Sequence, residues 1–479
     1  MHTVAEQNLQ RSTLLVFGSR LGSSVLVFLG VILFARSLGA GALGSFFLFQ
    51  SVLTILLFAT DLSLGTAAEK RISEGQPRAV VISTALSLKL LLLPAICAGV
   101  LLVQPWLNEY MGVEASLLLV LGLLIGGIGE FFIRVLSGDL RIGSTAVLEL
   151  SRRVVWLLGG LLLAERGWGA MGLIVAYVAG LAVMTGWALV RCELAFGRPT
   201  RDQARSLIRY AKFDFVAGSS HRVHNWADVL AIGYFLSPAA VGVYEIAWRI
   251  AVLAGMLSTS LSQVLFPEVS NADARDTIGR IRNAIHTSIF WSILAVVPAF
   301  FGAVLLATEI FEVVFRIESA PTVALGVLLF GMIFYAQFRP LNRALSGIDR
   351  VDLSARATAV SAGVNVVLNV SLVWYAGLTG AAVATTCAMI TSFVLTVVYT
   401  RSQVAFAYPL RKAGVVVGAA LLMAGVVLLA INLVAVTTVP QLLVVVVVGA
   451  AVYLLALLAH GMTREFLFDQ YRRAAGTDR

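Results

Sequence analysis

Long apolar runs recur along this chain and constrain its fold more than any other feature. Runs of the roughly 20 residues that a helix needs to cross a bilayer core predict about fourteen spans. We place them at residues 14–35, 42–61, 79–103, 115–136, 145–164, 168–190, 214–236, 240–265, 284–307, 322–345, 354–375, 378–400, 412–433 and 440–460. The runs are continuous rather than alternating, which argues against a transmembrane β-barrel. We therefore expect an all-α polytopic membrane protein.

Composition supports the same class. Of the 479 residues, 59% are hydrophobic and only 13% are charged, whereas soluble domains carry roughly 25% charged residues. The polar segment 1–11 precedes a long first apolar run without a small-residue cleavage site, so we expect this run to remain as the first span. The three cysteines, Cys97, Cys192 and Cys387, suggest neither a disulfide framework nor a metal site, and we expect no cofactor.

Basic residues predict the orientation in the membrane. Among the basic residues in the loops and the C-terminal tail, nearly all follow even-numbered spans, and the loops after odd-numbered spans carry only Arg36, Arg166 and Arg316. By the positive-inside rule, both termini are expected on the cytoplasmic side of the cell membrane. The net charge of +9 then reflects topology and contact with membrane lipids. Because the basic residues are scattered without an interleaved aromatic platform, no nucleic-acid partner is expected.

The chain also contains an internal repeat. Residues 134–141 (RVLSGDLR) recur as 343–350 (RALSGIDR), with five of eight positions identical at an offset of 209 residues. Segments 38–44 and 236–242 resemble each other at an offset of 198, and 169–172 and 377–380 at an offset of 208. Three matches in the same order indicate an ancestral duplication.

The repeat predicts two pseudo-symmetric six-helix lobes. We expect an N-terminal lobe at 1–190, a cytoplasmic linker with an amphipathic helix at 191–212, a C-terminal lobe at 213–400, and two extra helices with a cytoplasmic tail at 401–479. An even number of helices per lobe gives both lobes the same orientation, an arrangement of parallel repeats known from transporters. In the linker, Arg201, Arg205 and Arg209 share one helical face, which is typical of an interfacial helix; an ordinary solvated basic linker is the alternative.

Several ionisable or polar residues lie within the predicted spans. Each costs about 2.5–3.5 kcal/mol at the centre of a membrane helix, so such residues normally face a cavity or one another. The seventh and eighth spans are richest, with His221, Arg222, His224, Asn225, Asp228, Glu245, Arg249 and Gln263. In the first lobe, Arg20 lies inside the first span, and Asp61 shares a stripe of the second span with Gln50 and Thr54.

Simpler roles compete with a cavity role for some of these residues. The pairs Glu130/Arg134 and Glu245/Arg249 have the i, i+4 spacing of intrahelical ion pairs, and His224 could be a packing residue. Arg134, Arg141, Arg343 and Arg350 lie near cytoplasmic span ends, where they would serve as a gate or as snorkelling anchors. Asp61, Asp228 and Glu245 are candidates for ion coupling.

A cavity containing Arg20, Arg222 and Arg249, with His221, Asn225 and Gln263 as polar neighbours, favours an anionic cargo. Guanidinium groups bind phosphate oxygens in a fork geometry, so a pyrophosphate-linked lipid saccharide fits such a cavity. Enzymatic motifs, by contrast, are missing. The chain has no nucleophile elbow, phosphate-cradling glycine loop or His-Glu-x-x-His zinc motif, and the predicted outer loops are short. We therefore expect a transporter rather than an enzyme.

Seven stretches resemble the polysaccharide-biosynthesis flippases, the O-antigen and oligosaccharide translocases of the multidrug/oligosaccharidyl-lipid/polysaccharide exporter superfamily. They are residues 35–47, 61–65, 69–74, 228–244, 263–268, 365–369 and 380–385. The resemblance implies two six-helix lobes in a V shape, alternating access, and a lipid-linked saccharide as cargo. It also implies that Arg20, Arg222 and Arg249 correspond to the cationic cavity residues of that family. A monomer that cooperates with polysaccharide polymerase or ligase machinery is the expected working form.

Three other functions stay open at this stage. A cation-coupled multidrug antiporter of the same superfamily would be favoured by twelve spans and an acidic ion site in the membrane. A peptidoglycan lipid II flippase is a close variant of the main hypothesis. A membrane glycosyltransferase or polymerase belongs to a different class, and the short outer loops argue against it.

Overall fold

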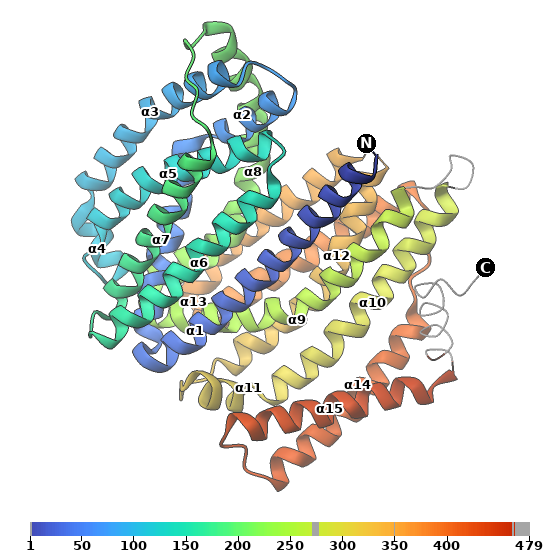
Figure 1. Cartoon of the computed structure of the whole chain (residues 1–479). Helices are drawn as coiled ribbons and strands as arrows, with labels where there is room; N and C mark the ends of the chain where they lie inside the picture. Colours follow the sequence, from blue (N-terminus) through green and yellow to red (C-terminus); the bar gives the residue numbers. More distant parts are fainter. Residues whose placement is uncertain (1, 271–276, 349, 462–463, 465–479) are drawn as a thin grey trace. The chain divides into compact units, whose positions relative to one another are not determined.

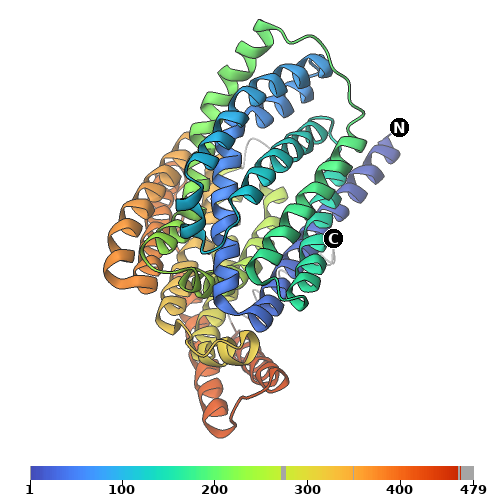
Figure 2. The same cartoon turned by 90° about the vertical axis from the view of Figure 1, so that its left-hand side faces the viewer.

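A computed structural model describes residues 2–270, 277–348, 350–461 and 464. Within these ranges, only the backbone is described for residues 2–17, 20–21, 142, 216–225, 257–270, 277–278 and 280. All regular secondary structure in these residues is helical (Figures 1 and 2). The chain divides into two compact units, Met1–Glu245 and Ile246–Arg479.

The first unit contains eight helices and the start of a ninth. In chain order they are α1 (His2–Asp61), α2 (Leu64–Ser73), α3 (Arg78–Leu102), α4 (Gln104–Met111), α5 (Ser116–Gly138), α6 (Ile142–Glu165), α7 (Gly169–Arg191), α8 (Arg201–Phe235) and the first residues of α9 (Pro238–Ser270). Helix α6 packs between α1 and α7, while α5 packs on α7 and α2. The predicted interfacial segment is the beginning of α8, where Arg201, Arg205 and Arg209 are exposed and Leu207 is buried.

The second unit continues α9 and adds the remaining helices. They are α10 (Thr277–Leu305), α11 (Ala307–Glu309), the π-helix η1 (Ile310–Phe315), α12 (Thr322–Gly347), α13 (Val351–Gln403), α14 (Leu410–Leu433) and α15 (Val439–Ala459). Helices α12 and α13 pack along each other, and α10 packs on α12 and α14.

Ten of the described helices are long and apolar enough to cross a membrane. Two of them, α1 and α13, are interrupted by a glycine with non-helical dihedral angles, Gly39 (φ 78°, ψ 175°) and Gly377 (φ 57°, ψ −135°). Each glycine lies between two spans that the sequence predicts separately. A positive φ costs glycine little, so the chain can leave the helix there and turn into the next one. The polytopic all-α class is confirmed; the number fourteen stays a prediction.

The internal repeat is visible in the backbone. Arg141 and Arg350 precede α6 and α13 with nearly the same dihedral angles, φ −90°, ψ 44° and φ −98°, ψ 48°. Their amides donate to Leu136 O and Leu345 O, which are again 209 residues apart. Gly169 and Gly377, which begin the matching segments at an offset of 208, both have a positive φ, 53° and 57°. The matched sequences therefore adopt matching local structures.

The third pair of matching segments, 38–44 and 236–242, is in direct backbone contact within the first unit. A Cβ on Gly44 would overlap the carbonyl group of Pro238 and lie 3.0 Å from the amide nitrogen of Gly242; a Cβ on Gly242 would overlap the carbonyl oxygen of Ala40 and lie 3.1 Å from the amide nitrogen of Gly44. The contact is reciprocal, because each glycine lies against the backbone that precedes or surrounds the other. Only glycine permits this approach of two backbones.

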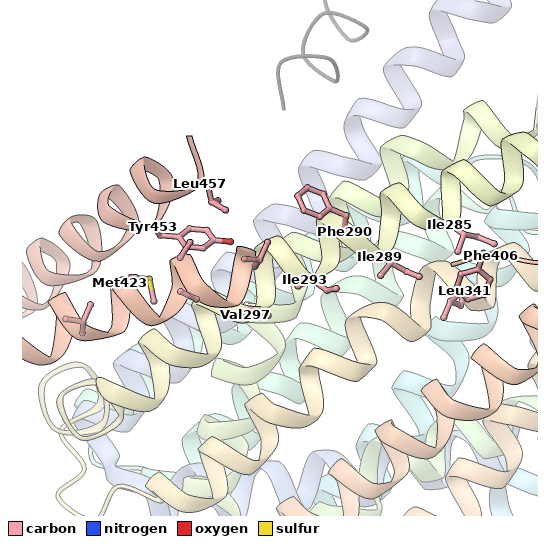
Figure 3. Packing of buried hydrophobic residues seen from close by; sticks show 14 of the residues in the cluster. Ile285, Ile289, Phe290, Ile293, Val297, Leu341, Phe406, Met423, Tyr453 and Leu457 are labelled. Atoms are coloured by element: carbon pink, nitrogen blue, oxygen red, sulfur yellow. The ribbon is translucent and has the colours of Figure 1, made fainter. Parts of the chain in front are cut away.

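The second unit has an apolar core that includes the two C-terminal helices. This core contains residues of three helices (Figure 3). They include Ile285, Ile289, Phe290, Ile293 and Val297 of α10, Met423 of α14, and Tyr453 and Leu457 of α15. The Tyr453 hydroxyl donates to Leu294 O at 2.8 Å, and the Tyr408 hydroxyl donates to Oε1 of Gln337 on α12. The shared core connects α14 and α15 to α10, the Tyr453 bond joins α15 to α10, and the Tyr408 bond joins the segment before α14 to α12.

Candidate functional site

Most residues of the predicted cationic cavity fall outside the described side chains. This applies to Arg20, His221, Arg222, Asn225 and Gln263, and the side chain of His224, a possible packing residue, is outside them as well. Arg249 is described and lies half-buried on α9. The cavity therefore stays a prediction for these residues.

Asp228 and Glu245 are both buried charged positions of the first unit, with 7% and 5% of their surface exposed. The hydroxyl of Tyr244, itself 1% exposed, donates to Oδ2 of Asp228 at 2.7 Å. This bond links α8 to the first turns of α9.

Asp61, the third candidate for ion coupling, ends α1 and already has two partners. Its Oδ1 lies 2.7 Å from Nζ of Lys89 on α3, and its Oδ2 accepts from the amide of Gly65 at 3.2 Å. The Lys89 side chain is 2% exposed. A lysine so deeply buried in an apolar helix requires an anionic partner, because an unpaired charge there is costly.

A second ion pair lies on α6, with a buried arginine and a partly exposed glutamate, and it contacts α7. Nη2 of Arg152 is 2.6 Å from Oε2 of Glu149, and its Nη1 donates to the Tyr177 hydroxyl at 3.2 Å. Glu130 of α5 interacts electrostatically with both Arg152 and Lys89. Glu130, which is exposed, thus carries a charge that acts on both ion pairs.

The sequence analysis missed Lys89, Glu149 and Arg152. The signal was present, because Lys89 lies within the predicted span 79–103, and Glu149 and Arg152 lie within 145–164. The argument that singled out Arg20 applies to them equally.

The predicted intrahelical pair of Glu130 with Arg134 needs correction. Nη1 of Arg134 instead lies 3.1 Å from Oε2 of Glu69 on α2. Glu130 interacts with Arg152 and Lys89. The i, i+4 spacing allowed the intrahelical pair, but α2 packs against α5 and offers Arg134 a carboxylate from a neighbouring helix.

The repeated arginines Arg141 and Arg350 each donate a hydrogen bond to the last residue of a helix. Nη1 of Arg141 donates to the carbonyl of Arg191, the last residue of α7, at 2.9 Å. Nη1 of Arg350 donates to Oε1 of Gln403, the last residue of α13, at 2.9 Å. Hydrogen bonds with Asp352 raise the pKa of Arg350, which keeps the guanidinium charged. A cation at a helix C-terminus also compensates the helix dipole.

Arg78 makes a similar contact in the first unit. Its Nε lies 3.1 Å from Oδ2 of Asp139, and its terminal nitrogens donate to the carbonyls of Cys192 and Glu193. Arg343 is half-buried in the last turns of α12. In the part of the chain that the structure describes, no three His, Cys, Asp or Glu side chains gather as metal ligands.

Comparisons with known proteins agree on one group. The family profile described as "Lipid II flippase MurJ" matches residues 153–449, and the profile "Polysaccharide biosynthesis protein" matches residues 9–273. The chain is 34% identical over 467 residues to the "Probable low-salt glycan biosynthesis flippase Agl15" of Haloferax volcanii, covering 97% of this chain and 99% of the relative. It is 26% identical to the "Probable flippase AglR" of the same organism, over 61% of this chain and 62% of the relative.

Two solved structures show the same fold at low sequence identity. The lipid II flippase MurJ in an inward closed conformation superposes with a TM-score of 0.78 and 16% identity, covering 95% of this chain and all (100%) of that chain. An inward-facing MATE family multidrug resistance transporter superposes with a TM-score of 0.61 and 19% identity, covering 79% of this chain and 94% of that chain.

Proposed function

The chain belongs to the polysaccharide-biosynthesis flippases of the multidrug/oligosaccharidyl-lipid/polysaccharide exporter superfamily, and from this premise we propose that it moves a lipid-linked glycan precursor across the cell membrane by alternating access. The observation that carries the proposal is the match to a relative named as a glycan biosynthesis flippase along 97% of this chain. Such a protein transports and does not catalyse a covalent step.

The headgroup of the cargo would bind in a cationic central cavity. Arg20, Arg222 and Arg249 would contact the phosphate groups, and His221, Asn225 and Gln263 would contribute hydrogen bonds. Arginine suits this role because its planar guanidinium binds phosphate in a bidentate geometry. The lipid tail would remain between apolar helices, where it needs no water-filled path.

Asp61, Asp228 and Glu245 are the acidic residues through which transport would be coupled to an ion. Asp61 already neutralises Lys89 at 2.7 Å, so an ion at this carboxylate would have to compete with an internal cation. Asp228 accepts from the hydroxyl of Tyr244.

In the cell, Arg134, Arg141, Arg343 and Arg350 would lie on the cytoplasmic side, where they gate the cavity or anchor the helices. Both termini would lie in the cytoplasm. The protein would work as a monomer that delivers its cargo to polysaccharide polymerase or ligase machinery on the outer side.

The leaflet distribution of lipid-linked saccharides tests the function directly. Cells depleted of the protein should accumulate a saccharide-lipid that an added, membrane-impermeant modifying enzyme cannot reach, and they should lose the corresponding surface glycan. If the saccharide-lipids stayed exposed while sensitivity to cationic drugs rose, the antiporter function would replace the proposal. Loss of the precursor itself would indicate an enzyme.

The cavity has a test of its own. Simultaneous substitution of Arg20, Arg222 and Arg249 by Gln should abolish surface glycan while the protein remains in the membrane. The control replaces the exposed Arg201, Arg205 and Arg209 by Gln, which removes the same number of charges from the start of α8. Unimpaired surface glycan in the first variant would refute the cationic cavity.

A further inference from the structure

The second unit has a pocket at the junction of α10 with the segment between α13 and α14. The pocket has a volume of about 680 Å³ and is lined by Arg282, Asn283, His286, Arg401, Ala405, Phe406 and Ala407. Arg282 and His286 are four residues apart on α10 and therefore lie on the same helical face. Arg401 comes from the last turn of α13. We call it the α10/α13 pocket.

Positive charge dominates this pocket. Its lining contains two arginines and a histidine but no carboxylate. Among the residues that the structure describes, Arg282 and Arg401 form no ion pair. A further cation, Lys412, lies close enough to His286 to interact with it electrostatically.

The first repeat shows how the chain neutralises a basic residue at the corresponding place. Arg78 begins α3, the third predicted span of its lobe, as Arg282 lies near the start of the third predicted span of the other lobe. Arg78 pairs with Asp139 at 3.1 Å, and the segment after α7 closes over α3 through hydrogen bonds from Gly197 N to Ala79 O and Ser83 Oγ. At the offset of 209, Asp139 corresponds to Ile348, which is followed by Asp349, a residue outside those that the structure describes.

One wall of the pocket is apolar. Phe406 is 7% exposed and belongs to the buried cluster with Ile285 and Leu341, beside which it lies in Figure 3. The guanidinium carbon of Arg401 lies 5.5 Å from the centroid of the Phe406 ring. A cation stacked on an aromatic face keeps its N–H groups at the edge available for an anion. Just beyond the pocket, α14 begins with Leu410, which is 72% exposed.

We propose that the α10/α13 pocket binds the phosphate group of a membrane lipid at the cytoplasmic surface, with Arg282, His286 and Arg401 around the phosphate and the lipid chain alongside α14. Arg282 and Arg401 lie just outside the predicted spans 284–307 and 378–400, in segments that the charge distribution assigns to the cytoplasm. Basic pockets between membrane helices on that side are suited to anionic lipid headgroups. The phosphate would belong either to an ordinary phospholipid or to the carrier of the saccharide, and the second source rests on the proposed function.

Native mass spectrometry of the purified full-length protein tests this site without transport. The probes are dioleoyl phosphatidylglycerol, a polyprenyl phosphate without sugar, and zwitterionic dioleoyl phosphatidylcholine for comparison. Two variants alter the pocket in opposite ways: Arg282→Gln with Arg401→Gln removes the cations, and Ala405→Glu keeps them but adds a competing carboxylate. The control, Arg166→Gln with Arg316→Gln, removes two exposed arginines elsewhere.

We expect both pocket variants to bind at least one of the two anionic lipids about tenfold more weakly, and the control to bind as the native protein does. An effect on phosphatidylglycerol identifies a phospholipid site, and an effect on polyprenyl phosphate alone identifies a site for the saccharide carrier. Unchanged binding of both lipids in both pocket variants would overturn the proposal, as would an equal loss in the control. Because no saccharide is moved, failure of the flippase assay would leave this result intact.

Discussion

At the residue scale, the Lys89–Asp61 pair shows most directly that a buried charge needs a partner of opposite charge. Lys89→Met leaves Asp61 without its cationic partner, and breaking a buried pair in this way typically costs about 3–5 kcal/mol. We expect a marked fall in the melting temperature of the detergent-solubilised protein. The double variant Asp61→Asn with Lys89→Met should recover much of the loss, because no charge is left unpaired.

The exposed pair Lys70–Glu74 provides the control. Its atoms are 3.4 Å apart and its side chains are 49% and 37% exposed. Such i, i+4 pairs contribute about 0.3–0.5 kcal/mol, so Lys70→Met should leave the melting temperature nearly unchanged. A Lys89→Met protein as stable as Lys70→Met would contradict the burial argument.

Tyr408 and Gln337 form a partly buried hydrogen bond between two uncharged side chains. The Tyr408 hydroxyl donates to Gln337, which is 3% exposed, so Tyr408→Phe leaves a buried amide oxygen without this donor at a cost of about 1–3 kcal/mol. Thermal unfolding of the variant should show the loss, while Tyr375→Phe, altered at a side chain that is 84% exposed, should not.

The same residue predicts a pH dependence. Burial raises the pKa of Tyr408 to about 12, from an ordinary value of 10.0. Because the folded state favours the neutral phenol, the contribution is fully present below pH 10 and is lost as the pH rises toward 12. The stability difference between the native protein and Tyr408→Phe should therefore be constant up to about pH 10 and shrink above it. A difference that instead shrinks between neutral pH and pH 10 would contradict this assignment.

At the scale of helices, the Gly44/Gly242 crossing is the most stringent contact. Gly44→Ala places a methyl group into the backbone of Pro238, and Gly242→Ala places one into Ala40. Because the obstacle is backbone rather than a flexible side chain, we expect each variant to lose at least about 3 kcal/mol or to accumulate poorly in the membrane. Gly41→Ala is the matched control, since a Cβ there meets nothing within 4 Å. Equal behaviour of the three variants would show that the crossing is not formed in the cell.

At the scale of the whole molecule, the distribution of basic residues predicts the topology. A fluorescent protein that matures only in the cytoplasm should fluoresce when fused after Arg479. The same reporter fused to a chain truncated after Glu114 should stay dark, because that loop follows the third predicted span and would face outward. Fluorescence of the truncated fusion alone would reverse the predicted orientation, and fluorescence of both fusions would contradict the predicted set of spans.

The sequence by itself determined the membrane class, the helical composition, the duplication and the break points near Gly39 and Gly377. These follow from local properties: the length and continuity of apolar runs, and residues that match at a constant offset. The resemblance in residues 35–47 and 228–244 also led to the family that the comparisons support. The same local reasoning predicted polar residues inside spans, which is why it named Asp61 and Asp228.

Only the tertiary structure decided which of these charges meet. Lys89 pairs with a residue 28 positions away and Arg134 with one 65 positions away, and neither partner can be read from spacing along a helix. The predicted Glu130/Arg134 pair was wrong for this reason: electrostatic energy depends on distance in space, and helix packing sets that distance. The close crossing of Gly44 and Gly242 and the open α10/α13 pocket likewise depend on how helices far apart in the sequence pack together.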